Sequence, residues 1–366
     1  MFKPHIAFLI LGWALSLIFP HVQSPSFAQT AAAAVDESRD RGIELYRQKK
    51  FKEAAKSLKK AVAKNKTDEQ SWYYLGLALV QLPKEFKDSS KPFETAIKLK
   101  PDFAAAHAGL SYSFLRRNKP GDALRTAQAA LTLDPRLAIA HYVISVVKLN
   151  YRDHDEALRE ALETIRLNPK LAAGYLVKSQ ALLGLYGARV IALVHPPLPN
   201  PSPPTALSAE ELAERRRKRK EAAVPLEEAA DSLETYLKLN TADPEDKFWR
   251  EQLVTLRIFS HVDLDPTSPN AILSGNEVTT KVRVLSKPEP RYTEAARRAQ
   301  ITGTVVLRAV FASDGTVRHF LVINYLPEGL TERAIEAARQ IKFTPALLDG
   351  KPVSMFIQLE YNFNLY

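Results

Sequence analysis

The sequence predicts two structural classes in series: an all-α superhelical solenoid of repeats, then a small α+β domain with an antiparallel sheet. Pro101, Pro135 and Pro169 are spaced by 34 residues, and each follows an apolar helix end, which indicates a helical repeat. Near the C-terminus every odd position from 353 to 365 is apolar, whereas the even positions are polar apart from Phe356. A period of two over this length indicates one long strand with one buried face.

Four repeats are readable over residues 36–170, with small residues such as Ala123 and Ala157 at the same interval as the prolines. This pattern resembles tetratricopeptide repeats, which implies paired helices that stack into a solenoid with a concave face. The geometry of that family implies which helix positions line this face, and they include Ile43, Leu77, Leu115 and Leu149. The candidate partner-binding residues among these positions are Arg39, Tyr46, Tyr73, Tyr112 and Tyr142. An aromatic groove would suit a peptide, but the same residues would equally serve as packing between helices.

Residues 171–260 are interpreted as a degenerate fifth repeat with an insertion over about 186–222. The insertion holds a Pro-rich tract and a charged helix from Ser208, where Glu211 completes a capping box. Leu226–Leu239 is the expected second helix of the repeat and is expected to pair with Leu171–Leu183. Residues 245–259 are expected to form a closing helix that packs on this pair. Residues 261–278, rich in Pro and Gly signals, are expected to form a linker.

The last region, 279–366, is predicted to fold as helix, strand, strand, helix, strand, with the helices on one face of the sheet. A hairpin is expected from Ile301–Phe311 and Val317–Ile323 around the Asp314-Gly315 turn. A short helix precedes it, and a second helix follows it with Thr331 as the expected N-cap.

Motifs in this region resemble the C-terminal domain of the TonB family. They include Pro290-Arg-Tyr292, Ile301-Thr-Gly303-Thr-Val305, Lys342-Phe343-Thr-Pro345 and Asp349-Gly350-Lys351-Pro352. The chain departs from the family at Thr293, where Pro is usual, and at Thr331, where Asp is common.

The resemblance implies that the last strand pairs with a short peptide of an outer-membrane transporter by β-augmentation. The implied site residues lie along this strand: Val353, Ser354, Met355, Phe356, Ile357, Gln358, Glu360 and Asn362. Phe356, alone on the polar face, is either a partner contact or covered by a neighbouring element. A long edge strand can also pair with its own copy, so a homodimer is a further option.

The N-terminus indicates export. Lys3 precedes an apolar stretch from Ile6 to Phe19, and small residues near Ala28 offer a cleavage site, so residues 1–28 are expected to be a signal peptide or a short anchor. The expected location is the periplasm, anchored in the inner membrane if the segment is retained. The chain has no Cys, which excludes disulfides, thiolate metal sites and a lipoprotein anchor.

No catalytic motif is found, so the chain is predicted not to be an enzyme and to need no cofactor. His107 and His141 occupy equivalent repeat positions, but no third ligand repeats with them, so aromatic packing is favoured over metal binding. The basic run Arg215–Lys220 is interpreted as a solvated helix face, with contact to anionic lipid or cell-wall polymer as the alternative, and not as a nucleic-acid site.

The sequence therefore predicts a non-enzymatic periplasmic adaptor that binds proteins through its repeats and outer-membrane transporter peptides through its last strand. The alternative is an envelope assembly scaffold whose C-terminal domain is structural or binds peptidoglycan. Only retention of residues 1–28 would allow coupling to an inner-membrane motor, because a cleaved protein cannot pull on a transporter by itself.

Overall fold

The computed structural model describes residues 37–194, 208–241 and 246–365, apart from Asp263, Pro266 and Pro269 and the side chains of 191–194. These residues divide into two compact units, 37–178 with 238–241 and 179–237 with 246–365. The predicted signal peptide or anchor and the whole Pro-rich tract, 195–204, lie outside the described residues. No described helix has the length and hydropathy needed to span a membrane.

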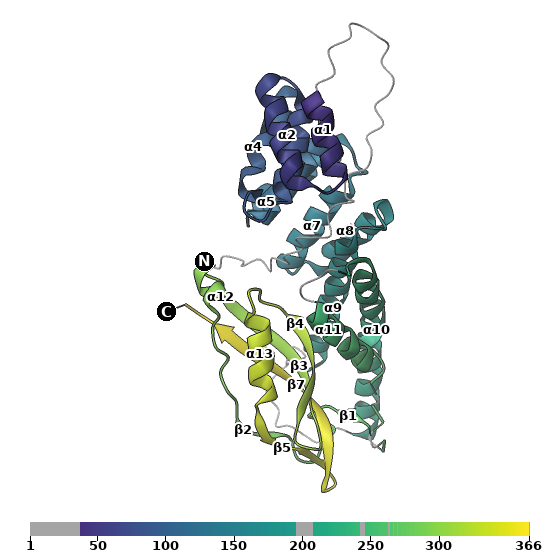
Figure 1. Cartoon of the computed structure of the whole chain (residues 1–366). Coiled ribbons are helices and arrows are strands. Elements are labelled where there is room, and N and C mark those ends of the chain that lie inside the picture. The colour runs from purple at the N-terminus through teal and green to yellow at the C-terminus, as the bar shows by residue number, and fades with distance from the viewer. Residues whose placement is uncertain are drawn as a thin grey trace. The chain divides into compact units, whose positions relative to one another are not determined.

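The first unit consists of helices in antiparallel pairs, as expected of a solenoid of helical repeats (Figure 1). The helices are α1 (Glu37–Arg47), α2 (Phe51–Lys64), α3 (Glu69–Val80), α4 (Ser90–Leu99), α5 (Ala104–Arg116), α6 (Pro120–Leu133), α7 (Ala138–Asn150) and α8 (His154–Leu167). The three periodic prolines follow the ends of α4, α6 and α8. The longer connection between α3 and α4 holds a 3-10 turn, Phe86–Asp88.

Small residues occur in this unit where helices approach closely. A Cβ atom on Gly109 would lie 2.4 Å from Cε1 of Phe93, and one on Gly76 would lie 2.8 Å from the same ring. Phe93 is fully buried, so its ring fills the space that the two glycines leave between neighbouring helices.

The second unit begins within α9 (Ala172–Val194) and continues with α10 (Ala209–Leu239) and α11 (Asp246–Ser260). The Ser179 hydroxyl donates to the Ala229 carbonyl at 2.8 Å, so α9 contacts α10 as predicted for the fifth pair. The capping box is confirmed, because Ser208 N–H donates to Glu211 and Glu211 N–H to the Ser208 hydroxyl. The charged helix and the expected second helix differ from prediction in being one 31-residue helix that runs through Pro225.

The sheet of this unit has the order β1-β7-β3-β4, with β6 pairing the start of β7. Its strands are β1 (Ile272–Leu273), β3 (Gly303–Phe311), β4 (Val317–Asn324), β6 (Ala346–Leu348) and β7 (Lys351–Phe363). β2 (Arg283–Ser286) and β5 (Lys342–Thr344) form a separate two-stranded sheet. The predicted hairpin is confirmed in β3 and β4, and Gly315 has the positive φ of 84° that the tight turn requires.

One face of the sheet carries α12 (Glu294–Arg298) and α13 (Leu330–Arg339) (Figure 1). Its core contains alternate residues of the strands, among them Leu307, Phe311, Leu359 and Tyr361, and the apolar stripe of α13. Thr293 caps α12 by accepting from the Ala296 N–H at 3.1 Å. The predicted cap Thr331 is wrong: Gly329 precedes α13, and Thr331 lies inside the helix with its hydroxyl bonded to the Leu326 backbone.

Helices also cover the second face and one edge, which corrects the prediction of helices on one face only. In α11, the Gln252 amide donates to the Phe320 carbonyl at 3.1 Å and accepts from the Val322 N–H at 3.2 Å. The side chain thereby replaces a neighbouring strand along β4. Phe259 of α11 packs on Phe356 with ring centroids 5.0 Å apart, on the face opposite α13.

Residues 261–278, expected as a linker, hold a strand and a buried carboxylate. β1 pairs in parallel with β7, with Ile272 beside Ser354 and Leu273 beside Met355. Glu277, whose side chain is 2% exposed, closes a turn back to Ser274. The segment is therefore part of the compact unit.

Candidate functional site: the free edge of β7

The long last strand has one paired side and one side that is only partly covered. β3 pairs with β7 from Met355 to Phe363 on one side. On the other side β6 pairs with Lys351–Val353 and β1 with Ser354 and Met355. No strand among the described residues pairs with residues 356–363 on that side, and we call this stretch the β7 free edge.

The direction of the backbone groups along this edge follows from two hydrogen bonds. Asn324 of β4 donates to the Thr304 carbonyl, which therefore points from β3 toward β4 and away from its register partner Asn362. Lys287 Nζ donates to the Glu360 carbonyl at 2.8 Å. Because successive peptide groups point to opposite sides of a strand, the outward-facing residues of the edge include Gln358, Glu360 and Asn362.

The predicted site residues lie on both faces of this strand. Met355 is buried on the α13 face, as are its neighbours Leu359, Tyr361 and Phe363, and Ile357 is half-buried beside them. Gln358, Glu360 and Asn362 are exposed on the other face. Val353 and Ser354 lie where β6 and β1 already pair, so they are outside the free edge.

Phe356 is half-buried, and its ring has covering contacts. Its ring packs on Phe259 and lies beneath two guanidinium groups, with the carbons of Arg308 and Arg219 at 5.0 and 5.4 Å from its centroid. Aromatic rings attract cations at this distance. Of the two roles considered for Phe356, partner contact or cover by a neighbouring element, these contacts favour cover by α10 and α11.

A buried ionic cluster lies beside this ring. Glu277 accepts from Arg216 Nε at 2.6 Å and from Arg219 Nη1 at 2.5 Å, and also from the N–H and hydroxyl of Ser274. Burial alone raises the pKa of the Glu277 carboxyl, but the Ser274 hydrogen bonds and the arginines outweigh it, so the pKa is lowered below its usual value. Arg219 also donates to the Ile272 carbonyl, which attaches β1 to α10.

Sequence reasoning did not find Glu277, Arg308 or Lys287. Glu277 was assigned to a linker, and its partner Arg219 is 58 residues away, so no local spacing indicates the pair. Two arginines of the basic run, Arg216 and Arg219, hold Glu277, while Arg217 pairs with Glu214 and Glu221 on its own helix. The solvated-face interpretation thus holds for only part of the run.

The four tyrosines proposed for the repeat groove are buried: Tyr46, Tyr73, Tyr112 and Tyr142 have 4 to 8% exposure. They pack as ring contacts, such as Tyr112 with Tyr142 at 6.4 Å. Arg39 is half-buried and pairs with Asp40 and Asp68. These positions therefore match the packing alternative, and burial raises the pKa of the tyrosine hydroxyls.

The two repeat histidines bind turns rather than each other. His107 Nε2 and His141 Nε2 lie 2.9 and 3.0 Å from the carbonyls of Pro101 and Pro135. His141 Nδ1 is also 2.6 Å from Glu160. No group of three or more His, Cys, Asp or Glu suited to a metal occurs in the described part of the chain.

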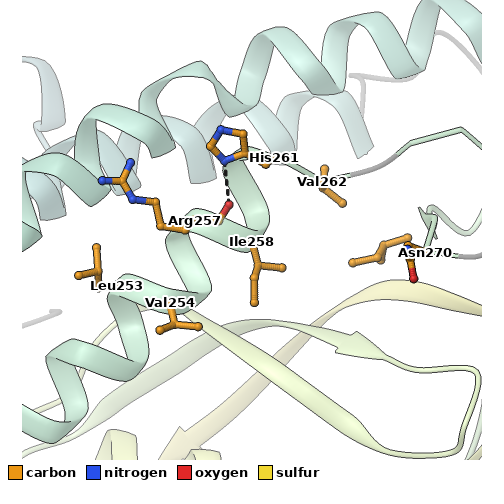
Figure 2. A pocket seen from close by; sticks show the side chains of 8 residues that line it. Leu253, Val254, Arg257, Ile258, His261, Val262 and Asn270 are labelled. Atoms are coloured by element: carbon orange, nitrogen blue, oxygen red, sulfur yellow. Dashed lines mark hydrogen bonds between the residues drawn. The ribbon is translucent and has the colours of Figure 1, made fainter.

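A pocket of about 670 Å³ lies on α11 and β1 (Figure 2). Leu253, Val254 and Ile258 supply an apolar wall, and His261 Nδ1 bonds to the Arg257 carbonyl at 3.1 Å. Arg257 is directed to carboxylates of α10, with Asp231 at 2.6 Å. Arg257 is thus engaged with α10 and His261 with the end of α11.

Two families match the two regions. Residues 288–365 match the model of the Gram-negative bacterial TonB protein C-terminal domain, and 39–87, 84–138 and 110–172 match the tetratricopeptide repeat model. The chain therefore carries tetratricopeptide repeats followed by a TonB-type C-terminal domain. Protein TonB of Vibrio cholerae serotype O1 is 32% identical over 108 residues, which is 27% of this chain and 43% of that protein. The chain thus spans less than half the length of this relative.

Solved structures similar to the chain include MamA, at 18% identity over 55% of this chain and 92% of that chain, with a TM-score of 0.37. PilW, described as a widely conserved type IV pilus biogenesis factor, is 16% identical over 62% and 87%, with a TM-score of 0.42. A thermophilic tetratricopeptide repeat protein of Thermus thermophilus is 15% identical over 60% and 97%, with a TM-score of 0.41.

Proposed function

We propose that this protein is a non-enzymatic adaptor of the cell envelope that binds an extended peptide along the β7 free edge. The partner is a periplasmic segment of an outer-membrane transporter, and the repeats hold a second protein. The observation that carries the proposal is the row of outward peptide groups at Gln358, Glu360 and Asn362. Main-chain bonds from such an edge supply affinity to any extended chain, while side-chain contacts select among chains.

The match of residues 288–365 to a TonB C-terminal domain supports this choice of partner. The match does not include the N-terminal segment through which an inner-membrane motor would act. Energy coupling therefore depends on whether residues 1–28 are retained as an anchor. We propose the periplasm as the location. Mass spectrometry of the mature N-terminus tests both points: a start at Gln29 excludes direct coupling, and retention of Met1–Ala28 supports an anchored transducer.

A proline scan of the edge tests the binding mode. Gln358→Pro removes an outward N–H and leaves the ladder with β3 intact, since proline is tolerated where its nitrogen faces away from the sheet. The matched control Gln358→Ala removes the same side chain and keeps the N–H. Fluorescein-labelled N-terminal peptides of outer-membrane transporters from the same genome serve as probes in anisotropy titrations.

We expect Gln358→Pro to bind about tenfold more weakly than Gln358→Ala, because one edge hydrogen bond is lost and the paired strand is displaced. Equal affinities of the two variants, with unchanged thermal stability, would exclude pairing at this edge.

The alternative scaffold role has one observation in its favour. Most of α9 and α10, all of α11 and the sheet form one compact unit, as expected of a structural module. Co-sedimentation with purified peptidoglycan separates the two functions. Retention on peptidoglycan, together with no change in anisotropy for every transporter peptide, would support the scaffold and refute the adaptor.

A further inference from the structure

The covered face of the sheet next to the β7 free edge holds more positive than negative charge. Arg216, Arg219 and Arg308 lie there with Glu277 as the carboxylate that pairs with the first two. No carboxylate among the described residues forms an ion pair with Arg308. A buried cation without a counter-ion is costly, so this imbalance calls for an explanation.

Arg308 is 9% exposed, and its Nε has no hydrogen-bond partner among the described residues. Two rings accept its guanidinium: Phe356 at 5.0 Å and Tyr186 of α9 at 5.9 Å. Phe356 belongs to β7, so the guanidinium of a β3 residue extends over β7, toward its free edge.

The register places Arg308 directly across from Gln358. Side chains of such a pair point to the same face of the sheet, and Gln358 is exposed, so this face is open to solvent one strand beyond Arg308. A strand paired with β7 continues the same row: Arg308, Gln358, then a residue of the partner. An acidic side chain at that partner position would approach the guanidinium from the open side.

The other charges near the row restrict the position of that acid. Glu277 occupies the end of the edge beside β1, where it holds Arg216 and Arg219. Glu360 is exposed on the same face two residues beyond Gln358, which disfavours an acid across from it. Lys287 reaches the edge from the outer side and bonds the Glu360 carbonyl. The position across from Gln358 is the one that Arg308 faces and no described carboxylate fills.

We propose that the β7 free edge selects extended peptides with an Asp or Glu at the residue facing Gln358, and that Arg308 is the specificity-determining residue. This inference rests on the proposed function and adds the chemical class of the partner. The carboxylate accepts from the Arg308 guanidinium and neutralises it, and Arg219, whose guanidinium also lies over the Phe356 ring, contributes positive potential. Peptide backbone bonds fix the register, and the ion pair sets the sequence preference.

The test uses the full chain to select from a phage-displayed library of random nine-residue peptides. We expect enrichment of β-forming peptides with an acid at one fixed register position. Synthetic peptides from the selection, each with its Glu-to-Gln counterpart, are then titrated against the wild type, and we expect about tenfold weaker binding of the amide form.

Arg308→Gln is the reciprocal variant, and Arg318→Gln is the charge-matched control, because Arg318 is exposed on β4 and pairs with Asp314. Arg308→Gln should bind the acidic and amide peptides equally, whereas Arg318→Gln should retain the tenfold preference. If Arg308→Gln does not fold, the acid-to-amide comparison on the wild type still decides the question.

Selected peptides that bind the edge without any acidic preference would overturn this inference and leave the proposed function standing. Failure to select any peptide, together with no protection of the Gln358 and Asn362 amides from hydrogen exchange when the transporter peptides are added, would overturn both this inference and the proposed function.

Discussion

Replacing the buried carboxylate Glu277 by Gln keeps the size of the side chain and removes its charge. The side chain of Arg219 is 12% exposed and that of Arg216 28%, and both lose their counter-ion in this variant. Breaking a buried pair costs about 3–5 kcal/mol, and because Arg216 is partly hydrated we expect the lower value, about 3 kcal/mol. Since Arg219 also bonds the Ile272 carbonyl, β1 should lose protection from hydrogen exchange together with Ser354.

Urea unfolding followed by Trp249 emission measures this change, because Trp249 is 5% exposed in α11 of the same unit. Trp13 and Trp72 are replaced by Phe so that one unit is observed. With a typical urea dependence, about 3 kcal/mol corresponds to a midpoint lower by roughly 1–2 M. The control Glu214→Gln removes an exposed partner of Arg217 on the same helix and should leave the midpoint unchanged.

The pH dependence gives a second readout. The folded-state pKa of Glu277 lies below the unfolded value, so its stabilisation is complete above pH 4.5 and is lost as the pH falls through the folded-state pKa. The wild type and Glu277→Gln should therefore converge in stability in acid. A variant as stable as Glu214→Gln at pH 7 would refute the assignment of the cluster as a structural anchor.

Three further predictions concern other sites. Lys287→Ala frees the Glu360 carbonyl, so peptides that pair with the β7 free edge should bind about threefold more tightly by anisotropy. Unchanged or weaker binding would show that Lys287 does not compete with the peptide for this carbonyl. Gly109→Ala forces a methyl against Phe93 and should cost about 1–3 kcal/mol in urea unfolding, whereas Gly121→Ala, with nothing within 4 Å of the new Cβ, should stabilise by about 0.5–1 kcal/mol. Burial lowers the pKa of His141, but hydrogen bonds with Glu160 and the Pro135 carbonyl outweigh it and raise the pKa, so the repeats should lose stability as the pH rises from 6 to 8. Glu160→Gln should remove this pH dependence, as measured by Trp72 emission.

Periodic features of the sequence predicted periodic structure well. The 34-residue spacing of prolines located the helix ends at Leu99, Leu133 and Leu167, because proline lacks the backbone N–H of a helix interior and so usually follows a helix end. The alternation from Val353 predicted both the length of β7 and its buried face, since the pleat directs successive side chains to opposite sides.

Features that depend on distant contacts were not accessible in this way. β1 has two residues and exists because Arg219 and β7 hold it, so its local sequence resembles a linker. The sequence predicted a charged helix and a separate second helix that starts at Leu226, yet α10 continues through Pro225, and Leu226 and Ala229 are buried on the same helix. The tyrosines proposed for the repeat groove were assigned from their positions in the family's repeat. Such a position does not determine whether the side chain faces solvent or packs between helices.

The helices on the second face of the sheet determine where this protein can be divided for experiments. A fragment starting at residue 279, the boundary that the sequence motifs suggest, would lack Gln252, Phe259 and Arg219. The β4 edge would then be unprotected and Phe356 uncovered, which are the conditions under which isolated sheets associate with their own copies. Self-association of such a fragment would therefore result from the surfaces that the truncation exposes. A fragment that includes α9 to α11 keeps these surfaces covered, so its oligomeric state is the one to compare with that of the intact chain.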